Sequence, residues 1–229
     1  MKTIGLLGGM SWESTSSYYR IINEAVREKL GGLHSARICM YSVEFGEVHS
    51  LMLAGNWDAV TEILSEAAGK LETSGSDFIL ICTYTMHKLA PEIQKSISIP
   101  VLHIGDAAAE ALARDGVKCA GLLGTRTTMQ QDFGRDRFER KGIKIITPSE
   151  PDMDIVNDVI FSELCAGVFR EESRKFFQDI MADMAAAGAE GIILGCTEIP
   201  LLVERKHSSV KLYDTTELHA LSAVERALF

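Results

Sequence analysis

The sequence has no excess of positive charge and no long apolar run. Its 229 residues carry a formal net charge of −9, and no basic cluster stands against that balance. Such a surface is unsuited to nucleic acid or to an anionic membrane, so we expect neither as a partner. No apolar stretch approaches the roughly 20 residues of a membrane span. The opening MKTIGLLGGM contains only a short apolar run that ends in glycines, which is unlike a secretory signal. These absences predict a cytoplasmic protein.

Paired cysteines are also lacking. The five cysteines are odd in number and widely spaced, at Cys39, Cys82, Cys119, Cys165 and Cys196. None forms a Cys-x-x-Cys pair, and no histidine stands beside one at the spacing of metal ligands. The sequence therefore predicts neither a disulfide framework nor a metal site, in keeping with a reducing compartment.

What the chain does contain is a regular alternation of short apolar runs with longer amphipathic segments. The runs are apolar on both faces, as buried parallel strands are, and lie at 4–8, 38–43, 77–81, 100–104, 120–124, 143–146 and 191–195. Segments 56–72 and 171–186 carry apolar residues at helical spacing, and Asn56 is a suitable N-cap for the first. Alternation of this kind predicts an α/β fold with parallel sheets, in one large domain or two small ones.

An internal repeat is the most informative feature of the sequence. Three pairs of segments match in the same order, at offsets of 116, 113 and 108 residues, with Gly5 on Gly121, Gly75 on Gly188 and Asp106 on Asp214. A period this long that occurs only twice excludes a solenoid and predicts a duplicated α/β half. The alternative is that any two strand–loop–helix units share this degree of likeness.

We therefore predict two pseudo-symmetric domains, each a parallel-sheet αβα sandwich. The first domain comprises 1–100 and 208–229, because the last strand and helix are expected to rejoin the first half. The second domain comprises 101–207. Ligands of open α/β sheets bind outside the carboxyl ends of the strands, so the active site is expected in the cleft between the domains.

The repeat also pairs two side chains that can carry protons. Its second match places Thr83 on Cys196 and Cys82 on Gly195, each directly after a buried strand. Inversion of a stereocentre needs one group that removes the α-proton from one face and another that delivers a proton to the opposite face. The pair Thr83 and Cys196 fits this requirement if the two halves face each other.

These two positions lie in motifs that point to a family. The first motif is CTYTMH (82–87) and the second is GCTEI (195–199), and the chain also contains GLLGGMSWEST at its start and LLGTRTTM at 122–129. With these segments the chain resembles the aspartate/glutamate racemase family over essentially its whole length, particularly the broad-specificity amino-acid racemase branch. The resemblance implies a cofactor-independent isomerase, without pyridoxal phosphate, that moves a proton at Cα of a free amino acid by two bases.

The resemblance also implies roles for residues of both motifs. Cys196 and Thr83 become the catalytic pair, because the family's first cysteine falls on Thr83, and Cys82 is the alternative to Thr83. The neighbouring residues of the same motifs, Thr85, Thr197 and Glu198, are expected to bind substrate.

Three departures from the family pattern bear on the substrate. Tyr84 stands where the family usually has an asparagine that binds the substrate's α-carboxylate or amine. Met52 and Cys165 fall near the places of two cationic side chains that hold the distal carboxylate of acidic substrates. The substrate is therefore expected to be aspartate or glutamate, or a broader and more neutral set of amino acids.

The turns after the first strand of each half offer backbone N–H groups to a small anionic ligand. We expect Met10 and Ser11 to approach the ligand from one turn and Thr125 from the other; the first turn lacks the G-x-G-x-x-G spacing of a nucleotide site. Ser11 and Thr127 are equally consistent with plain helix N-caps. His87 either orients the first motif or, as is commoner for a lone helix histidine, has a structural role.

The two proposed proton carriers differ in acidity. A helix expected to begin after Cys196 would lower the pKa of its thiol from about 8.5 toward working pH. The Thr83 hydroxyl is a far weaker acid and needs a base or a polarised site to activate it. We therefore expect the two directions of the reaction to be catalysed unequally.

Two other functions stay open at this point. Hydantoin racemase, maleate isomerase and arylmalonate decarboxylase relatives use similar strand-end cysteines on other substrates. A non-catalytic metabolite-binding protein would retain the cleft after losing one proton carrier. In every case we expect a small-molecule partner and, from the general frequency of symmetric oligomers, a homodimer.

Overall fold

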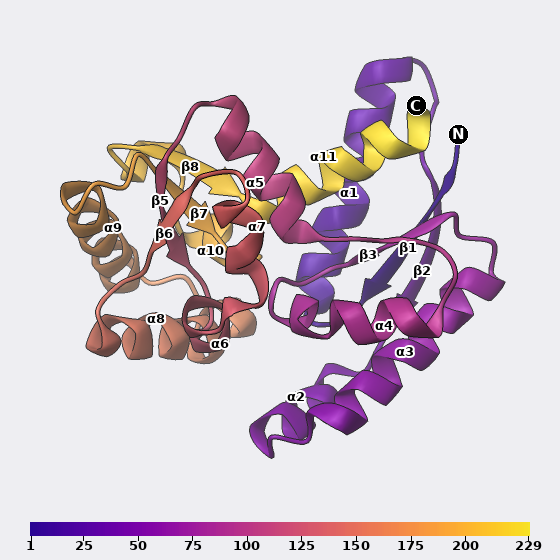
Figure 1. Ribbon diagram of the computed structural model, residues 1–229, viewed down its shortest axis with the longest axis horizontal. Helices are drawn as coiled ribbons and strands as arrows, with labels where there is room; N and C mark the ends of the chain where they lie inside the picture. Colours follow the sequence, from indigo (N-terminus) through magenta and orange to yellow (C-terminus); the bar gives the residue numbers. More distant parts are fainter. The chain divides into compact units, whose positions relative to one another are not determined.

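The computed structural model describes residues 1–229 and divides them into two compact units (Figure 1). Met1–Ile104 and His219–Phe229 form the first unit, and Gly105–Leu218 forms the second. Each unit contains one parallel four-stranded sheet with helices on both faces, which confirms the predicted α/β class. None of the helices combines the length and apolar character that crossing a membrane requires.

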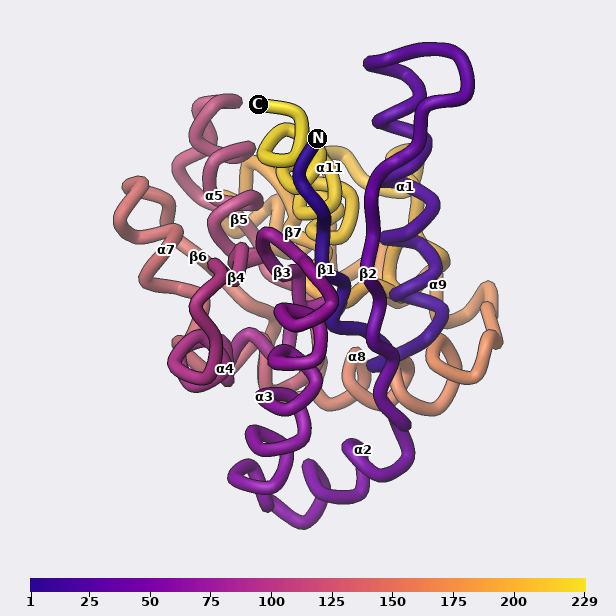
Figure 2. Tube along the Cα trace, turned by 90° about the vertical axis from the view of Figure 1, so that its right-hand side faces the viewer, coloured from indigo at the N-terminus to yellow at the C-terminus, as the bar shows by residue number.

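The sheet of the first unit has the strand order β2-β1-β3-β4, and the strands lie side by side in this order in Figure 2. They are β1 (Thr3–Gly8), β2 (Arg37–Ser42), β3 (Phe78–Ile81) and β4 (Val101–Leu102). Their side chains alternate between the two faces of the sheet. Leu6 and Leu80 point to one face, and Leu7 and Ile81 point to the other.

Four helices cover these two faces. The first face packs against α1 (Trp12–Leu30) and α11 (Thr215–Leu228), and the second packs against α3 (Trp57–Thr73) and α4 (Ala90–Ser96). A shorter helix, α2 (Phe45–Leu53), follows β2. Asn56 caps α3 as predicted, because its side chain accepts a hydrogen bond from the Ala59 amide at 3.3 Å. Both termini lie together in this unit, where the Lys2 amide donates to the Ala227 carbonyl at 2.9 Å (Figure 1).

The sheet of the second unit has the order β6-β5-β7-β8. Its strands are β5 (Cys119–Leu123), β6 (Lys144–Ile146), β7 (Gly191–Leu194) and β8 (Lys211–Asp214). One face packs against α5 (Ile104–Arg114) and α7 (Arg135–Glu139), and the other against α8 (Glu150–Ser162) and α9 (Glu171–Ala186). Two short helices, α6 (Arg126–Gln130) and α10 (Ile199–Leu202), follow β5 and β7.

The register of the strands supports the duplication. β1 pairs with β3 so that Ile4 lies opposite Phe78, and β5 pairs with β7 so that Ala120 lies opposite Gly191. These pairs are related by the offsets of 116 and 113 residues that the sequence indicates. The strand orders of the two sheets correspond as well, since β2, β1, β3 and β4 take the places of β6, β5, β7 and β8.

The third predicted match is wrong by three residues. Ile79 lies opposite Val101 in the first sheet, and its equivalent Ile192 lies opposite Leu212 in the second, which gives an offset of 111. His103, rather than Asp106, is therefore the equivalent of Asp214. Backbone pairing fixes this register, whereas the sequence match depended on one shared aspartate.

The predicted domain boundaries at 100/101 and 207/208 also require correction. β4 pairs with β3 in the first sheet and β8 pairs with β7 in the second, so each strand stays in its own half. Only the helix after β8 rejoins the first unit, where its Ala220, Ala223 and Val224 are buried. The repeat explains this placement, because β8 corresponds to β4 and must pair with the equivalent neighbour.

Candidate active site

In the first unit the predicted site residues follow the carboxyl ends of two adjacent strands. Met10 and Ser11 come after β1, and Thr83, Tyr84 and Thr85 come after β3. Because the strands are parallel, both turns lie at the same edge of the sheet. The structure therefore brings these five residues to one sheet edge.

Thr83 and Cys82 have different surroundings. The Cys82 side chain is fully buried among Tyr18, Ile22 and Ala223, and burial raises the pKa of its thiol far above the ordinary value. Thr83, the next residue, is half-buried. Neighbouring residues of an extended segment point to opposite sides, and here it is the cysteine that points into the core.

The turn after β1 is held by side chains of the helix that follows it. Thr15 Oγ1 accepts a hydrogen bond from the Gly9 amide at 2.9 Å and donates to the Ser11 carbonyl at 2.9 Å. Ser11 is the N-cap of α1, where its hydroxyl accepts from the Ser14 amide at 3.3 Å. Met10 is buried in the apolar cluster beneath α3. The structure therefore confirms that Ser11 is a helix N-cap.

In the second unit the predicted residues follow β7 in the order Cys196, Thr197, Glu198. The Cys196 thiol donates to Glu198 Oε2 at 3.0 Å, and the Thr197 hydroxyl donates to the same oxygen at 2.8 Å. Glu198 is only 5% exposed and Cys196 only 7%. A buried carboxylate that accepts from a thiol and from a hydroxyl can receive a proton from either.

The pKa of Cys196 is shifted opposite to the predicted direction. Burial raises the pKa of the thiol well above its ordinary value, and the Glu198 carboxylate raises it further. The expected helix is the four-residue α10, which begins three positions after the cysteine. So short a helix has a small dipole and its effect is confined to the first turn, so it does not offset burial beside a carboxylate.

Thr125 lies at the same edge of the second sheet, two residues after the end of β5. It is the N-cap of α6, and its hydroxyl accepts from the Thr128 amide at 3.3 Å and lies 3.1 Å from the Thr128 hydroxyl. The predicted capping role of Thr127 is therefore wrong, since Thr125 takes it. Thr125 corresponds through the repeat to Gly9, so the two turns differ in how they use their side chains.

The remaining predicted residues lie on neighbouring segments. Cys165 belongs to a short turn of helix, Leu164–Ala166, and packs against the apolar cluster that contains Cys196. Met52 lies near the end of α2 and packs half-buried against the cluster of the first unit. Tyr84 and Thr85 are both buried.

The sequence already offers His87 as a residue that orients the first motif, but it does not reveal the other polar residues around Thr83. The Ser14 hydroxyl donates to the Cys82 carbonyl at 2.8 Å, and the buried rings of His87, His103 and His219 gather behind the turn. These residues lie as far apart in sequence as positions 14, 82 and 219, and no local spacing joins them. The only available signal was the histidine count of this half.

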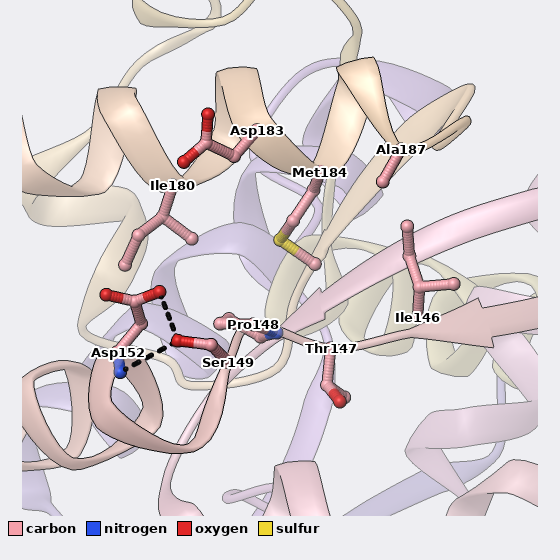
Figure 3. A pocket seen from close by; sticks show the side chains of 9 residues that line it. All are labelled: Ile146, Thr147, Pro148, Ser149, Asp152, Ile180, Asp183, Met184 and Ala187. Atoms are coloured by element: carbon pink, nitrogen blue, oxygen red, sulfur yellow. Dashed lines mark hydrogen bonds between the residues drawn. The ribbon is translucent and has the colours of Figure 1, made fainter.

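A separate pocket of about 290 Å³ lies beside the end of β6 (Figure 3). Met184 reaches from α9 toward Ile146, and Ser149 accepts from the Asp152 amide at 3.4 Å while donating to its carboxylate at 2.6 Å. Asp152 and Ser149 thus form the cap of α8. None of the residues predicted for the site lines this pocket.

Comparison with known proteins places the chain in a family. The sequence profile of the Asp/Glu/hydantoin racemase family matches residues 7–223, which is nearly the whole chain. The chain belongs to this family. The resemblance stated from the CTYTMH and GCTEI motifs is thereby confirmed.

Individual relatives of the racemase family match over the full length. A protein from Yersinia pestis described as a proposed Asp/Glu racemase is 47% identical, with a TM-score of 0.93 and 100% of both chains covered. An aspartate racemase homologue from Pyrococcus horikoshii OT3 is 33% identical, with a TM-score of 0.86 and the same coverage. The broad specificity amino-acid racemase RacX of Bacillus subtilis (strain 168) is 24% identical over 228 residues, 98% of each chain.

Proposed function

We propose that this member of the family is an amino-acid racemase that inverts Cα of a free amino acid without a cofactor, using Cys196 and Thr83 as its two proton carriers. Family membership supports racemase chemistry. The observation that carries the choice of residues is the repeat, because Thr83 and Cys196 follow equivalent strands at equivalent register. The burial of Cys82 in the core supports Thr83 over its neighbour.

The geometry of the second unit suggests how the thiol is activated. The Cys196 proton passes to Glu198, 3.0 Å away, and the thiolate then removes the α-proton of the substrate. Thr83 delivers its hydroxyl proton to the opposite face of the planar carbanion. Glu198 then releases a proton and the Thr83 alkoxide regains one through solvent, which restores the starting state. This sequence gives Glu198 a role in proton transfer in addition to the predicted substrate contact.

Two-base chemistry requires both strand ends to reach one substrate. We propose that Thr83 and Cys196 do so, and that water is excluded from the substrate while the proton is moved. The α-proton of an amino acid is very weakly acidic, so charge that develops on the carboxylate must be stabilised. The backbone N–H groups of the turns after β1 and β5, next to Ser11 and Thr125, are suited to this role. Met52, Tyr84, Thr85, Cys165 and Thr197 are the proposed contacts of the remaining substrate atoms.

The unequal acidity of the two carriers has a specific kinetic consequence. Enantiomers have equal free energies, so kcat/KM for inversion must be the same in both directions. The expectation that the two directions are catalysed unequally therefore does not hold for kcat/KM, and the asymmetry appears in solvent exchange instead. The enantiomer that Cys196 deprotonates is expected to exchange its α-proton more often than it inverts. The reason is that the Cys196 thiol returns a proton to the same face of the carbanion faster than Thr83 delivers one to the opposite face. The other enantiomer is expected to exchange only when it inverts.

The test is incubation of the purified protein in deuterated water with L- and D-amino acids, without added cofactor. The panel includes aspartate, glutamate and small neutral amino acids, and chirality and Cα-deuteration are followed together. We expect deuterium to enter with inversion and Cys196→Ala to abolish both. Thr83→Ala is expected to stop inversion but to leave exchange from one enantiomer. The preferred amino acid identifies the substrate class.

Two matched variants separate Thr83 from Cys82. Thr83→Cys places a thiol, with an ordinary pKa of about 8.5, where a much weaker acid stood, so inversion is expected to become faster relative to exchange. Cys82→Ala is expected to keep the ratio of the two rates. Loss of inversion in Cys82→Ala with none in Thr83→Ala would reverse the assignment. Absence of exchange from every amino acid would favour hydantoin-type, maleate or decarboxylase chemistry, or a binding protein.

A further inference from the structure

The backbone on either side of the Thr83 amide is fixed by side chains. The Cys82 carbonyl, which precedes it, accepts from the Ser14 hydroxyl at 2.8 Å, and the Thr83 carbonyl, which follows it, lies 2.8 Å from His87 Nδ1. The Cys82 amide is also bound, since it donates to the Leu7 carbonyl at 2.9 Å. The main chain around the proposed proton carrier is therefore held from two directions.

The hydrogen bonds of His87 define its protonation state. The Ile104 amide donates to Nε2 at 3.1 Å, and an amide can only donate, so Nε2 carries the lone pair. The Thr83 carbonyl can only accept, so Nδ1 carries the hydrogen. His87 is thus a neutral imidazole that bridges the turn after β3 to the first residue of α5.

Neighbouring rings restrict the position of this imidazole. His87 is 1% exposed and packs edge-on against His103, with centroids 4.6 Å apart, and against His219, at 5.5 Å. His219 Nε2 lies 3.0 Å from the Leu102 carbonyl, and its Nδ1 lies 2.9 Å from the Tyr18 hydroxyl. His219 and His87 therefore hold the residues on the two sides of His103, at the end of β4.

The second half of the repeat has no equivalent of this arrangement. The offset of 113 residues places His87 on Pro200, whose side chain has no hydrogen-bonding group. Cys196 instead has the Glu198 carboxylate against its thiol. The histidine thus stands on the side of the weaker acid, where correct placement of the hydroxyl matters most to the rate.

We propose that His87 is a positioning residue for Thr83, and that its Nδ1–H bond to the Thr83 carbonyl holds the hydroxyl in line with the substrate Cα. This inference rests on the proposed function. A displacement of about 1 Å at a reacting group can cost on the order of 100-fold in rate. Loss of the bond should therefore slow protonation by Thr83 without affecting proton removal by Cys196.

Two variants of similar size separate the two hydrogen bonds of the imidazole, one to the Thr83 carbonyl and one from the Ile104 amide. Asparagine at position 87 places an amide N–H close to the former Nδ1, so His87→Asn keeps the donor to Thr83 and loses the acceptor for Ile104. Glutamine places its terminal amide near the former Nε2, so His87→Gln keeps a partner for Ile104 and loses the donor to Thr83. Both variants remove the ring, and both leave Ser14 and the Cys82 carbonyl unchanged.

The measurement is the ratio of α-proton exchange to inversion in deuterated water, for the enantiomer that Cys196 deprotonates. We expect His87→Gln to raise this ratio by about 10- to 100-fold with little change in KM, and His87→Asn to stay within a few-fold of the unsubstituted protein. Equal ratios in both variants, or parallel loss of exchange and inversion in His87→Gln alone, would overturn the proposal.

Nitrogen NMR of histidine-labelled protein tests the same arrangement independently of activity. We expect His87 to be protonated at Nδ1 only and His219 at Nε2 only at neutral pH. Protonation of His87 at Nε2 would overturn the proposal even if both variants were unfolded. If the expected tautomers are found and the unsubstituted protein exchanges no amino acid, the hydrogen-bond arrangement stands and the proposed function fails.

Discussion

Glu198 has two opposite effects on Cys196. Its carboxylate accepts the thiol hydrogen bond at 3.0 Å and so offers a destination for the proton. The same negative charge, after burial, raises the pKa of the thiol and disfavours the free thiolate. Transfer of the thiol proton to Glu198 leaves the net charge of the pair at −1, so a thiolate formed in this way adds no second negative charge to the buried site, as the proposed proton transfer requires.

This opposition predicts that Glu198→Gln makes Cys196 more reactive toward an alkylating agent but less active in exchange. Glutamine has the same shape and no charge, so the pKa of the thiol falls and the thiolate fraction at pH 8 rises, by up to about tenfold for each pKa unit. Alkylation by iodoacetamide, located by peptide mass spectrometry, is expected to be several-fold faster. Exchange of the substrate α-proton is expected to fall because the proton acceptor is gone.

Thr197→Val provides the control for that experiment. It removes the other hydrogen bond to Glu198 Oε2 and keeps the charge next to the thiol. Alkylation of Cys196 should change little in this variant. Slower alkylation in Glu198→Gln than in the unsubstituted protein would show that the carboxylate promotes the thiolate instead of suppressing it.

The element that positions the first half of the site is the turn between β1 and α1. Gly9 has φ of +95°, and a Cβ built there would lie 2.3 Å from the Val43 carbonyl oxygen and 2.6 Å from its amide nitrogen. Both contacts are with backbone at the end of β2, which cannot move without shifting a strand. The close approach thus couples the turn that carries Met10 and Ser11 to its neighbouring strand.

Gly9→Ala and Gly75→Ala form a matched pair for this element. Both glycines have positive φ, +95° and +88°, but nothing lies within 4 Å of a Cβ at Gly75. Gly75→Ala should therefore lower the free energy of unfolding only by the cost of holding an alanine at positive φ, about 1–2 kcal/mol. Gly9→Ala should lower the free energy of unfolding clearly more, because the new Cβ also overlaps the backbone of Val43. Urea unfolding of the two variants measures the difference, and equal losses would contradict the argument.

The elements themselves could be predicted in large part from the sequence. Periodicity located α9 at 171–186 and the ends of β3 and β7 within a residue, because these segments are long or fully buried and are bounded by glycine or a polar residue. The strand predicted at 100–104 is only β4, Val101–Leu102, since α5 begins at Ile104. Only His103 separates the strand from the helix, so the apolar run continues into the helix and its end does not mark the end of the strand.

The candidate site could be predicted only in part, and the roles of its residues stay a prediction. The internal repeat predicts Thr83 and Cys196 as an equivalent pair, because the register of the strands depends on the local apolar pattern. The contact of Ser14 with the Cys82 carbonyl and the position of His219 behind His87 depend on tertiary packing. The raised pKa of Cys196 could not be foreseen either, because it arises from burial and from the direction of one carboxylate.

For the molecule as a whole, the duplication includes a reciprocal exchange of helices. β4 lies in the first sheet, but the helix that follows it, α5, packs on the second; β8 lies in the second sheet, but α11 packs on the first. The chain therefore passes between the units at Ile104, whose amide donates to His87, and again at Leu218, which precedes His219. Each half is completed by a helix that starts in the other.

His219 lies at the second of these passages and links the stability of the fold to pH. Burial lowers the pKa of its imidazole well below the ordinary value of 6.5, and the facing His87 lowers it further, while the Leu102 carbonyl partly opposes the shift. Tyr18 is the other titratable group in contact with the ring. In the unfolded chain the same histidine binds a proton near its ordinary pKa, so below about pH 6.5 the unfolded state takes up a proton that the folded state does not.

The free energy of unfolding is therefore expected to fall as the pH drops below about 6.5, with His219 contributing up to about 1.4 kcal/mol per pH unit. At higher pH the contribution is constant, since the imidazole is neutral in both states. His219→Gln keeps an N–H donor for the Leu102 carbonyl but does not titrate, so its unfolding free energy should decline less between pH 7.5 and 5.5. Urea unfolding at the two pH values, in both proteins, gives the comparison. Other groups titrate alike in the two proteins, so an equal decline in both would exclude His219 as the source.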